Sequence, residues 1–440
     1  MPTLCSTNFV RPRALSCLPP SAALSMKSIL LACVVLFQAG VLRAQMQAAN
    51  RAAEANGITQ EDQKGIDEDV ALHLGSVPAD PGPKAKLSAS LQPAAVLTAV
   101  RKVADWELAS TQPYFARDWE WGTLYTGFMA ASEATGDTRY RDAMLKMAEG
   151  FHWELVAKLP DANEQCVGQT YLELYLAKPA PEKIQPIRAA LDDLVAGKAR
   201  EVPPEEIQTA WWMADWLYMA PPVWTRMYAA THERKYLEYL DKHWWENSDR
   251  LYDTQHHLFY RDLSYVRGKR DRHGNPTFWS RGNGWVMGGL VRMLTYLPED
   301  DPNRGRYETQ LREMAAEVAS IQDKKNGLWH ADLLDAEDYP QPENSGSAFL
   351  TFALAWGVNH GVLDRATYLP VIAKAWRGLL DNIYADGRLG NIQQTGDSPA
   401  HYLASSTYIY GVGAYLLAGA QVAQLEAHAA KATHPRNPAQ

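Results

Sequence analysis

Apolar residues recur at helical spacing over most of the chain after residue 92. No run of alternating apolar and polar residues is long enough to support a large sheet, although short strands fit into the loops. The pattern therefore predicts an all-α protein. Its twelve helices are expected to begin near Pro93, Glu120, Arg139, Val167, Glu182, Ile207, Lys235, Gly282, Arg306, Ser345, Ala366 and Ser405.

The connectors between the predicted helices alternate between short and long. Three short ones are polar turns followed by Tyr, at 135–140, 231–236 and 362–368, and the long ones include 251–280, 322–344 and 383–403. Successive connectors of an antiparallel helical array alternate between its two ends, so the long connectors share one face. We predict an (α/α)6 barrel of six helical hairpins over residues 93–425, with long loops on the active-site face. A two-layer helical bundle is the alternative.

The two ends of the chain depart from this pattern. From Met26 the chain has a cationic start, an apolar run from Ile29 to Phe37 and Ala44 as a cleavage point, which is the layout of a secretory signal peptide. The apolar run is too short to span a bilayer stably. We interpret the terminal segments as upstream sequence plus signal peptide (1–44, with the signal around 26–44), a flexible lead-in (45–92) and a disordered tail (426–440).

Cysteine usage agrees with export. Three of the four cysteines precede residue 45 and leave with the signal segment, so only Cys166 stays in the mature chain. A lone cysteine excludes an intramolecular disulfide and a cysteine metal site. We expect a periplasmic or secreted protein that is not inserted in the membrane after cleavage.

We expect the mature chain to begin near Gln45, because the apolar run ends shortly before Ala44 and the cationic start is Lys27. N-terminal sequencing of the periplasmic protein checks this expectation. A mature protein that retains residues 1–25 would contradict both the signal peptide and the late start.

Composition narrows the classes of partner. The chain has 43 Lys and Arg against 51 Asp and Glu, a net charge of -8, which argues against nucleic acid as a partner. Tryptophan, at 15 residues, outnumbers phenylalanine at 9, which suits stacking of indoles on sugars, with helix packing as the alternative for each indole. No pair of histidines has the spacing of a metal motif and no nucleotide-binding fingerprint occurs, so we predict no metal and no cofactor.

Polar and aromatic residues gather where helices follow the long connectors. Five segments share this feature: DWEWG (118–122), NEQCVGQ (163–169), WWMADWLYM (211–219), FWSRGNGWVMG (278–288) and ENSGSAF (343–349). Because the barrel brings them to one end, we predict a composite carbohydrate site there, with packing as the alternative.

Asp215 is the predicted catalytic carboxylate. It lies in an otherwise apolar and aromatic helical stretch, where loss of hydration raises the pKa of a carboxyl. A raised pKa suits a general acid at neutral pH. The alternative is a buried Asp that caps a neighbouring helix or pairs with Arg281.

Two arginines are candidates for holding an anionic ligand. Arg281 can grip a carboxylate with two hydrogen bonds, and Trp279 and Trp285 flank it; the alternative is a structural ion pair at a helix start. Arg261 lies on the longest connector, with a solvated loop arginine as the alternative. Glu343 fits a helix N-terminus. We interpret it first as a capping residue and second as a site residue.

Together these motifs resemble glycoside hydrolase family 105, the unsaturated rhamnogalacturonyl and glucuronyl hydrolases, which are related to family 88. The likeness covers residues 95–420. It rests, in the family's order, on WWMADWLYM followed by Ala220-Pro221-Pro222, FWSRGNGW at 278–285, Gly327-Leu328-Trp329 and ENSGS at 343–347. It implies an (α/α)6 barrel that removes a 4,5-unsaturated uronic acid from the non-reducing end of lyase-generated oligosaccharides.

The resemblance implies chemistry with one carboxylate rather than two. Asp215 matches the family's catalytic aspartate and would protonate C4 of the C4=C5 vinyl ether. Water positioned by the same carboxylate would add at C5. The resulting hemiketal opens and expels the remaining sugar, so the reaction requires neither a metal nor an organic cofactor.

The resemblance also assigns the residues around Asp215. Asn163 stands where many relatives carry a second aspartate, so Asn163 and Glu164 are the candidates for a second site residue. The expected substrate-binding residues are Trp121, Trp211, Met219, Arg261, Trp279, Arg281, Asn283 and Trp285. We expect Arg281→Leu to weaken binding of the uronate far more than it damages the fold.

Three function hypotheses follow, with an unsaturated oligosaccharide as the expected partner of the first. A hydrolase consumes the conjugated double bond, so ultraviolet absorbance of an unsaturated disaccharide falls. A polysaccharide lyase on the same barrel makes the absorbance of an intact polymer rise. A non-catalytic oligosaccharide-binding protein leaves the absorbance unchanged.

Overall fold

A computed structural model describes residues 57–198 and 210–433, which all belong to one of the two units into which the chain divides, residues 52–440. The described elements are α2 (Gln60–Ala71), β1 (Gly75–Ser76), α3 (Pro93–Thr111), a 3-10 turn (Gln112–Tyr114), α4 (Trp119–Thr135), α5 (Thr138–Gly150), α6 (Ala162–Gln165), α7 (Gly168–Ala177), α8 (Pro181–Val195), α9 (Trp216–Met219), α10 (Pro221–Thr231), α11 (Lys235–Leu251), β2 (Tyr252–Asp253), β3 (Leu258–Phe259), α12 (Leu263–Val266), α13 (Ser280–Leu294), α14 (Arg304–Ser320), α15 (Asn344–Asn359), α16 (Arg365–Leu380), β4 (Thr407–Tyr408) and α17 (Ile409–Thr433). The short strands form two antiparallel pairs, β1 with β4 and β2 with β3.

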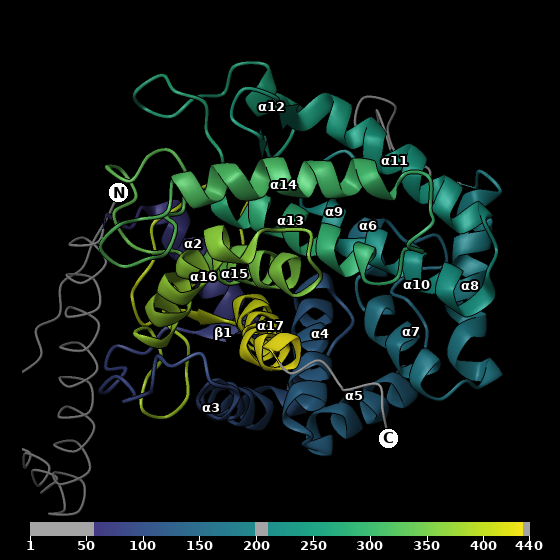
Figure 1. Cartoon of the computed structure of the whole chain (residues 1–440), viewed down its shortest axis with the longest axis horizontal. Helices are drawn as coiled ribbons and strands as arrows, with labels where there is room; N and C mark the ends of the chain where they lie inside the picture. Colours follow the sequence, from purple (N-terminus) through teal and green to yellow (C-terminus); the bar gives the residue numbers. More distant parts are fainter. Residues whose placement is uncertain (1–56, 199–209, 434–440) are drawn as a thin grey trace, which may run out of the picture. The chain divides into compact units, whose positions relative to one another are not determined.

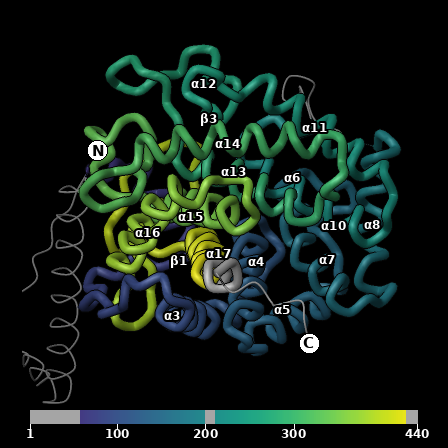
Figure 2. Tube along the Cα trace, viewed as in Figure 1, coloured from purple at the N-terminus to yellow at the C-terminus, as the bar shows by residue number. Residues whose placement is uncertain are grey.

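Six of the helices form a closed inner ring. Each packs on the next in the order α4, α7, α10, α13, α15, α17 and back to α4. The helices α3, α5, α8, α11, α14 and α16 surround this ring, and each packs on the inner helix beside it in the chain (Figure 1). The trace in Figure 2 alternates between the two rings along the sequence. The predicted (α/α)6 barrel is therefore confirmed, and the two-layer bundle is wrong.

The inner helices are apolar on nearly all sides because they are enclosed on nearly all sides. In α15 every residue from Asn344 to Val358 is buried, and in α13 every residue of the helix is buried. Small residues allow the closest helix contacts. A Cβ on Gly127 in α4 would lie 2.7 Å from the Cα of Gly413 in α17, so the two backbones meet at glycines.

The short Tyr-containing turns and the three longest connectors lie at opposite ends of the barrel, as the sequence predicts. The three Tyr-containing turns each lead from an inner helix to an outer one, whereas 252–279, 321–343 and 381–408 each lead from an outer helix to an inner one. The N-termini of all six inner helices therefore lie at the long-connector end. Ten of the twelve expected helices begin within two residues of the expected position.

Several expectations for the chain outside the barrel core require correction. The described part of the lead-in is not loose, because it contains α2 and β1, and β1 pairs with β4 through Gly75 and Tyr408. The last helix begins at Ile409 rather than near Ser405, since β4 precedes it, and it continues to Thr433 rather than ending at residue 425. The expected start of a helix near Ile207 and the expected signal segment lie outside the described residues.

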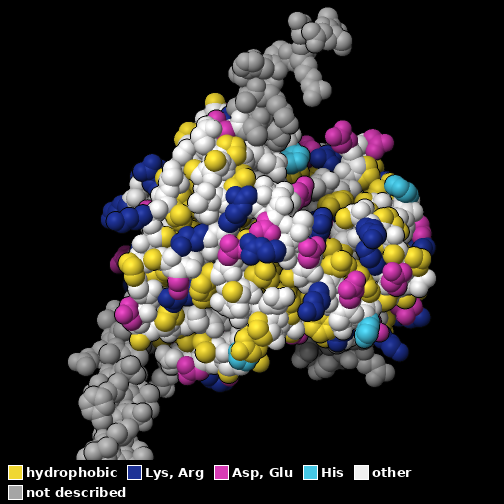
Figure 3. All heavy atoms as spheres, turned by 90° about the horizontal axis from the view of Figure 1, so that it is seen from below, with side chains coloured by type: hydrophobic (Ala, Val, Ile, Leu, Met, Phe, Trp, Pro, Cys, Tyr) yellow, Lys and Arg dark blue, Asp and Glu magenta, His cyan; other side chains and the backbone are white. Residues whose placement is uncertain are grey.

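The surface carries both signs of charge. On the face drawn in Figure 3, basic and acidic side chains are interspersed. This mixture of charges is consistent with the net charge of -8. The face shows no continuous basic surface that would bind a polyanion. Among the described residues, no helix combines the length and the apolar character needed to cross a bilayer.

Candidate active site

The stretch that carries Asp215 is not the continuous helix that its composition suggests. Only Trp216–Met219 form a helical turn, α9, and Asp215 is its N-cap residue. The residues before it are held in an irregular conformation because the Asn247 side chain donates to the carbonyls of Trp211 (2.8 Å) and Met213 (3.0 Å). These bonds replace the intrahelical partners that the carbonyls would otherwise need.

Asp215 is a confined carboxyl beside a cation. Its side chain is 13% exposed, and its Oδ2 accepts no hydrogen bond. Oδ2 lies 3.7 Å from Nε of Arg261, which is beyond hydrogen-bond distance, so the two groups attract each other without sharing a proton. Burial raises the pKa of Asp215, and the positive charge of Arg261 opposes this rise. The direction is the one predicted from its apolar surroundings.

Arg261 is placed by one backbone bond and one side-chain bond. Its carbonyl accepts from the Ala214 N–H at 2.9 Å, which joins it to the Asp215 segment. Nη1 donates to Asp262 at 2.8 Å, and the guanidinium lies 5.6 Å from the Trp212 ring. Its Nε, which faces Asp215, has no hydrogen-bond partner. With its side chain 16% exposed, Arg261 is a cation held at the surface of the site.

Asn283, which we expected to bind substrate, instead secures the strand that leads to Arg261. Its Oδ1 accepts from the Phe259 N–H at 2.7 Å, and its Nδ2 donates to the Phe259 carbonyl at 3.0 Å. The side chain is completely buried. Both amide groups are therefore committed to the backbone, and Asn283 acts on the site through β3.

Arg281 is completely buried and belongs to the support of the site. Nη1 and Nη2 donate to the carbonyls of Gln393 and Gln394, each at 2.8 Å. The guanidinium lies between two rings, 4.3 Å from Trp279 and 4.9 Å from Tyr410. This arrangement favours the structural alternative for Arg281, with backbone carbonyls in place of the ion-pair partner that we considered.

We therefore revise the expectation for Arg281→Leu. The variant should lower the free energy of unfolding by about 1–3 kcal/mol, because the Gln394 carbonyl loses its donor, whereas the Gln393 carbonyl keeps a bond from the Tyr410 hydroxyl. Urea denaturation measures this, with Arg267→Leu, at an exposed position of the connector that precedes α13, as the control. An unchanged unfolding midpoint together with a raised KM would show that Arg281 binds the substrate and is not structural.

The expected stacking residues lie in the core. The side chains of Trp121, Trp211, Met219, Trp279 and Trp285 are each at most 2% exposed. Trp285, for example, packs against Phe349 with ring centroids 4.5 Å apart. The packing alternative therefore holds for these residues in this structure.

Two partly exposed indoles were missed by the sequence prediction. Trp119 lies beside Trp285, with ring centroids 5.8 Å apart, and Trp212 lies edge-on to Trp216 at 5.5 Å. Both belong to the segments singled out in the sequence, close to the indoles that we selected. Only the direction of each side chain distinguishes them, and the sequence pattern did not resolve it.

Asn163 and Glu164 lie on α6, which packs on α9, the helical turn whose N-cap residue is Asp215. Glu164 forms a reciprocal capping pair with Asp161, in which each side chain accepts from the other's backbone N–H at 3.0 Å. This contact gives Glu164 a structural task. Asn163 is partly exposed, and it remains the better placed of the two for contact with a ligand.

Glu343 is a capping residue, as its position in the sequence indicates. Its carboxylate accepts from the Ser345 N–H at 3.1 Å and from the Gly346 N–H at 2.7 Å at the start of α15. It also accepts from the Gln393 N–H at 3.1 Å, and its side chain is completely buried. These bonds place Glu343 in the framework under the connector 381–408.

Two further carboxyls with perturbed acidity were not predicted. Burial raises the pKa of Glu120, at the start of α4, to about 8, and nearby Asp118 and Asp69 add to the rise. Burial raises the pKa of Asp332 to about 7, and its Oδ2 has no hydrogen-bond partner. Both lie at the long-connector end; Glu120 belongs to the DWEWG segment singled out in the sequence, whereas Asp332 lies outside the five segments.

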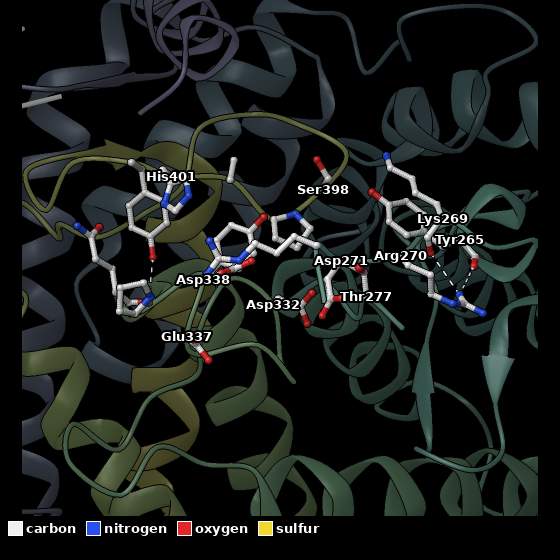
Figure 4. Close-up of a pocket in the computed structure, with 17 residues that line it drawn as sticks. Tyr265, Lys269, Arg270, Asp271, Thr277, Asp332, Glu337, Asp338, Ser398 and His401 are labelled. Atoms are coloured by element: carbon white, nitrogen blue, oxygen red, sulfur yellow. Dashed lines mark hydrogen bonds and ion pairs between the residues drawn. The ribbon is translucent and has the colours of Figure 1, made fainter. Parts of the chain in front are cut away.

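Asp332 lines a cavity of about 720 Å³ between three long connectors (Figure 4). One wall carries Tyr265, Lys269 and Arg270, and the others come from 332–341 and 398–402. Neither Asp215 nor Arg261 lines the cavity, but Tyr265 lies in α12, whose N-cap residue Asp262 pairs with Arg261. Its aromatic and charged lining suits a polar ligand such as an oligosaccharide.

Among the described residues, one group of three side chains could offer ligands to a metal ion: His273, Asp335 and Asp338. A cation already occupies this group, because Arg272 contacts the Asp338 carboxylate and its Nε donates to Nε2 of His273 at 3.1 Å. The guanidinium thus balances the charge that a metal ion would balance. The arrangement gives no reason to place a metal in the reaction.

Comparisons with known proteins agree with this architecture. The model of Glycosyl Hydrolase Family 88 matches residues 95–426. The unsaturated 3S-rhamnoglycuronyl hydrolase of Formosa agariphila is 36% identical over 342 residues, which cover 74% of this chain and 89% of that protein.

Two solved structures share the fold over most of the barrel. A family 88 glycosyl hydrolase from Bacteroides vulgatus is 28% identical with a TM-score of 0.71, covering 76% of this chain and 99% of that one. A structure described as a polysaccharide lyase is 34% identical with a TM-score of 0.70, covering 76% of this chain and 98% of that one.

The expected relationship to families 105 and 88 is confirmed. The matching model is that of family 88, the family related to the one we expected. Two structures described as family 105 members are 19% and 20% identical with TM-scores of 0.59 and 0.61, which shows a common fold alone. Because the family model spans most of the barrel and a relative at 36% identity covers the same region, this chain belongs to Glycosyl Hydrolase Family 88.

Proposed function

We propose that the protein removes a 4,5-unsaturated uronic acid from the non-reducing end of an oligosaccharide by hydrating the C4=C5 double bond. The observation that carries this proposal is the state of Asp215. It is a confined carboxyl with a raised pKa, an oxygen that accepts no hydrogen bond and a cation 3.7 Å away. These are the properties of a general acid that works beside an anionic substrate.

In the proposed reaction, protonated Asp215 donates its proton to C4 of the vinyl ether, and positive charge develops at C5 and the ring oxygen. The resulting carboxylate then takes a proton from water as the water oxygen bonds to C5. The product is a hemiketal, which opens and releases the remaining sugar from C1. Asp215 ends the cycle protonated, so one residue serves as acid and base.

Arg261 replaces Arg281 as the residue that we assign to the uronate carboxylate. Arg261 is partly exposed next to Asp215, whereas Arg281 is completely buried. The six inner helices also direct the positive ends of their dipoles toward this end of the barrel. We assign Trp212, which lies beneath Arg261, and Trp119 to contact with the sugar rings.

The substrate class that we propose is an unsaturated rhamnoglycuronyl oligosaccharide. The name of the Formosa agariphila relative supports this choice, and the identity extends over most of both chains. The cavity lined by Tyr265 and Asp332 would hold the sugar beyond the scissile bond. Its lining carries basic and acidic side chains together, among them Lys269, Arg270, Asp332 and Glu337, which can hydrogen-bond the hydroxyl groups of a sugar.

The test is to incubate the purified protein with an unsaturated rhamnoglycuronyl disaccharide made by a lyase. We expect absorbance at the wavelength of the conjugated double bond to fall, because hydration destroys the conjugation. Unchanged absorbance would contradict the proposal and leave a non-catalytic binding protein. An inert saturated disaccharide serves as the control.

A second candidate function is eliminative cleavage, because a structure described as a polysaccharide lyase is 34% identical to this chain. A lyase creates a double bond rather than consuming one. Incubation with an intact uronate-containing polymer would then raise the absorbance. The direction of the absorbance change therefore separates the two reactions on the same barrel.

We also propose that the protein acts in the periplasm or outside the cell. The support is the arrangement of charged, apolar and small residues around 26–44, which lies outside the described part of the chain. Cell fractionation with an antibody against the barrel tests this location.

A further inference from the structure

We infer that Asp69 on α2 is a positioning residue for the active site, and that α2 holds the connector 393–397 in the conformation that binds substrate. The inference rests on the proposed function, since it concerns the site formed by Asp215 and Arg261. It gives the segment before the barrel a role in substrate binding.

The contact between α2 and the connector is direct. Asp69 is 4% exposed, and its Oδ2 accepts from the Thr395 N–H at 2.7 Å. At the other end of α2, Asp62 Oδ1 accepts from Nε2 of Gln394 at 3.3 Å. These bonds join residues more than 320 positions apart in the sequence. A capping box at Thr59 and Asp62 fixes the start of α2, so the helix presents both carboxylates on one short rigid element.

The connector is held from the barrel side at the residues just before Thr395. Arg281 donates to the carbonyls of Gln393 and Gln394, and the Tyr410 hydroxyl donates to the Gln393 carbonyl at 2.6 Å. Glu343 accepts from the Gln393 N–H. Barrel contacts therefore secure residues 393 and 394, while α2 secures the N–H of residue 395.

Beyond Thr395 the connector reaches the arginine that we assign to the uronate. The Tyr265 hydroxyl donates to the Asp397 carbonyl at 3.3 Å. Tyr265 lies in α12, whose N-cap residue Asp262 pairs with Arg261 at 2.8 Å. A continuous series of contacts thus leads from α2 through the connector and α12 to Arg261, which lies 3.7 Å from Asp215.

A purely structural role for Asp69 makes a different prediction. If Asp69 only attaches α2 to the barrel, its removal changes stability and leaves the kinetic constants alone. If it positions the connector, its removal acts on substrate binding in the folded enzyme. The proton transfer itself uses Asp215, so kcat should change much less than KM.

The experiment compares Asp69→Ala and Asp69→Asn with Asp67→Ala, an exposed position on the same helix, as the control. With the unsaturated rhamnoglycuronyl disaccharide, Asp69→Ala should raise KM about fivefold, the effect of one lost hydrogen bond, with kcat within twofold. Asp69→Asn keeps an acceptor for the Thr395 N–H and should restore KM to within twofold. Hydrogen exchange in the 393–397 segment should be faster in Asp69→Ala than in the control.

A second variant keeps the inference testable if Asp69→Ala does not fold. Gln394→Ala removes the other side-chain contact to α2 without altering α2, and should raise KM about two- to threefold. A native KM in a folded Asp69→Ala or, failing that, in Gln394→Ala would overturn the inference while the proposed function stands. An inactive native enzyme would overturn both.

Discussion

Replacement of Asp215 by Asn should lower kcat for the unsaturated disaccharide by about 10²–10⁴-fold, because the amide supplies no proton for C4 and no base for water. KM should stay within about threefold of the native value. The amide is nearly isosteric with the carboxyl, and the segment is held by Asn247 and Arg261 through backbone groups rather than through the Asp215 side chain.

Loss of absorbance at saturating substrate measures this effect. Asp249→Asn provides the matched control, because Asp249 is an exposed aspartate on α11 with a side chain that is 73% exposed. A rate for Asp215→Asn within about threefold of the native rate would remove Asp215 from the mechanism.

The pH dependence of the native enzyme follows from the same assignment. Burial raises the pKa of Asp215, and the reaction uses its protonated form. Activity should therefore fall as pH rises through that raised pKa. An aspartate of ordinary pKa would already be ionised at neutral pH, so retention of activity near neutrality is the observation to look for.

Replacement of Arg261 by Gln should raise KM by about 10- to 150-fold, because a hydrogen bond to a charged group contributes about 1.5–3 kcal/mol. Arg267→Gln is the control, since Arg267 is exposed on the same connector. Initial rates over a range of disaccharide concentrations separate KM from kcat. A native KM in the Arg261 variant would show that another group holds the uronate.

Arg261→Gln also makes a prediction about acidity that loss of binding alone does not make. The positive charge of Arg261 lowers the pKa of Asp215. Its removal should raise that pKa, so the decline in kcat at high pH should move to higher pH. An unmoved decline would mean that Arg261 and Asp215 are not coupled in the complex.

The helices and their alternation could be predicted because they depend on local pattern. Apolar spacing marks the buried stripe of each helix, and connector length marks the end of the barrel at which it lies. The segment around Asp215 could not be predicted in the same way. Its composition favours a helix, but the side chain of Asn247, on α11, donates hydrogen bonds to the carbonyls of Trp211 and Met213.

The resemblance located Asp215 and the segments around it, but it did not separate site residues from supporting ones. Trp119 and Trp121 lie two positions apart in one segment, and only Trp119 is partly exposed. Likewise, Arg261 and Arg281 carry the same functional group, so residue type alone does not distinguish them. One faces Asp215, and the other is enclosed by the carbonyls of the connector.

By itself, the sequence determined the all-α barrel, the end of the barrel at which the long connectors gather and the acidic residue in an apolar segment, because each depends on residues close together in the chain. The tertiary structure alone decided which indoles are exposed, which arginine stands beside Asp215 and that α2 reaches Thr395. These features depend on partners far apart in the chain. A side chain's hydrogen bonds and burial are set by those partners, whose positions only the closed ring of helices determines.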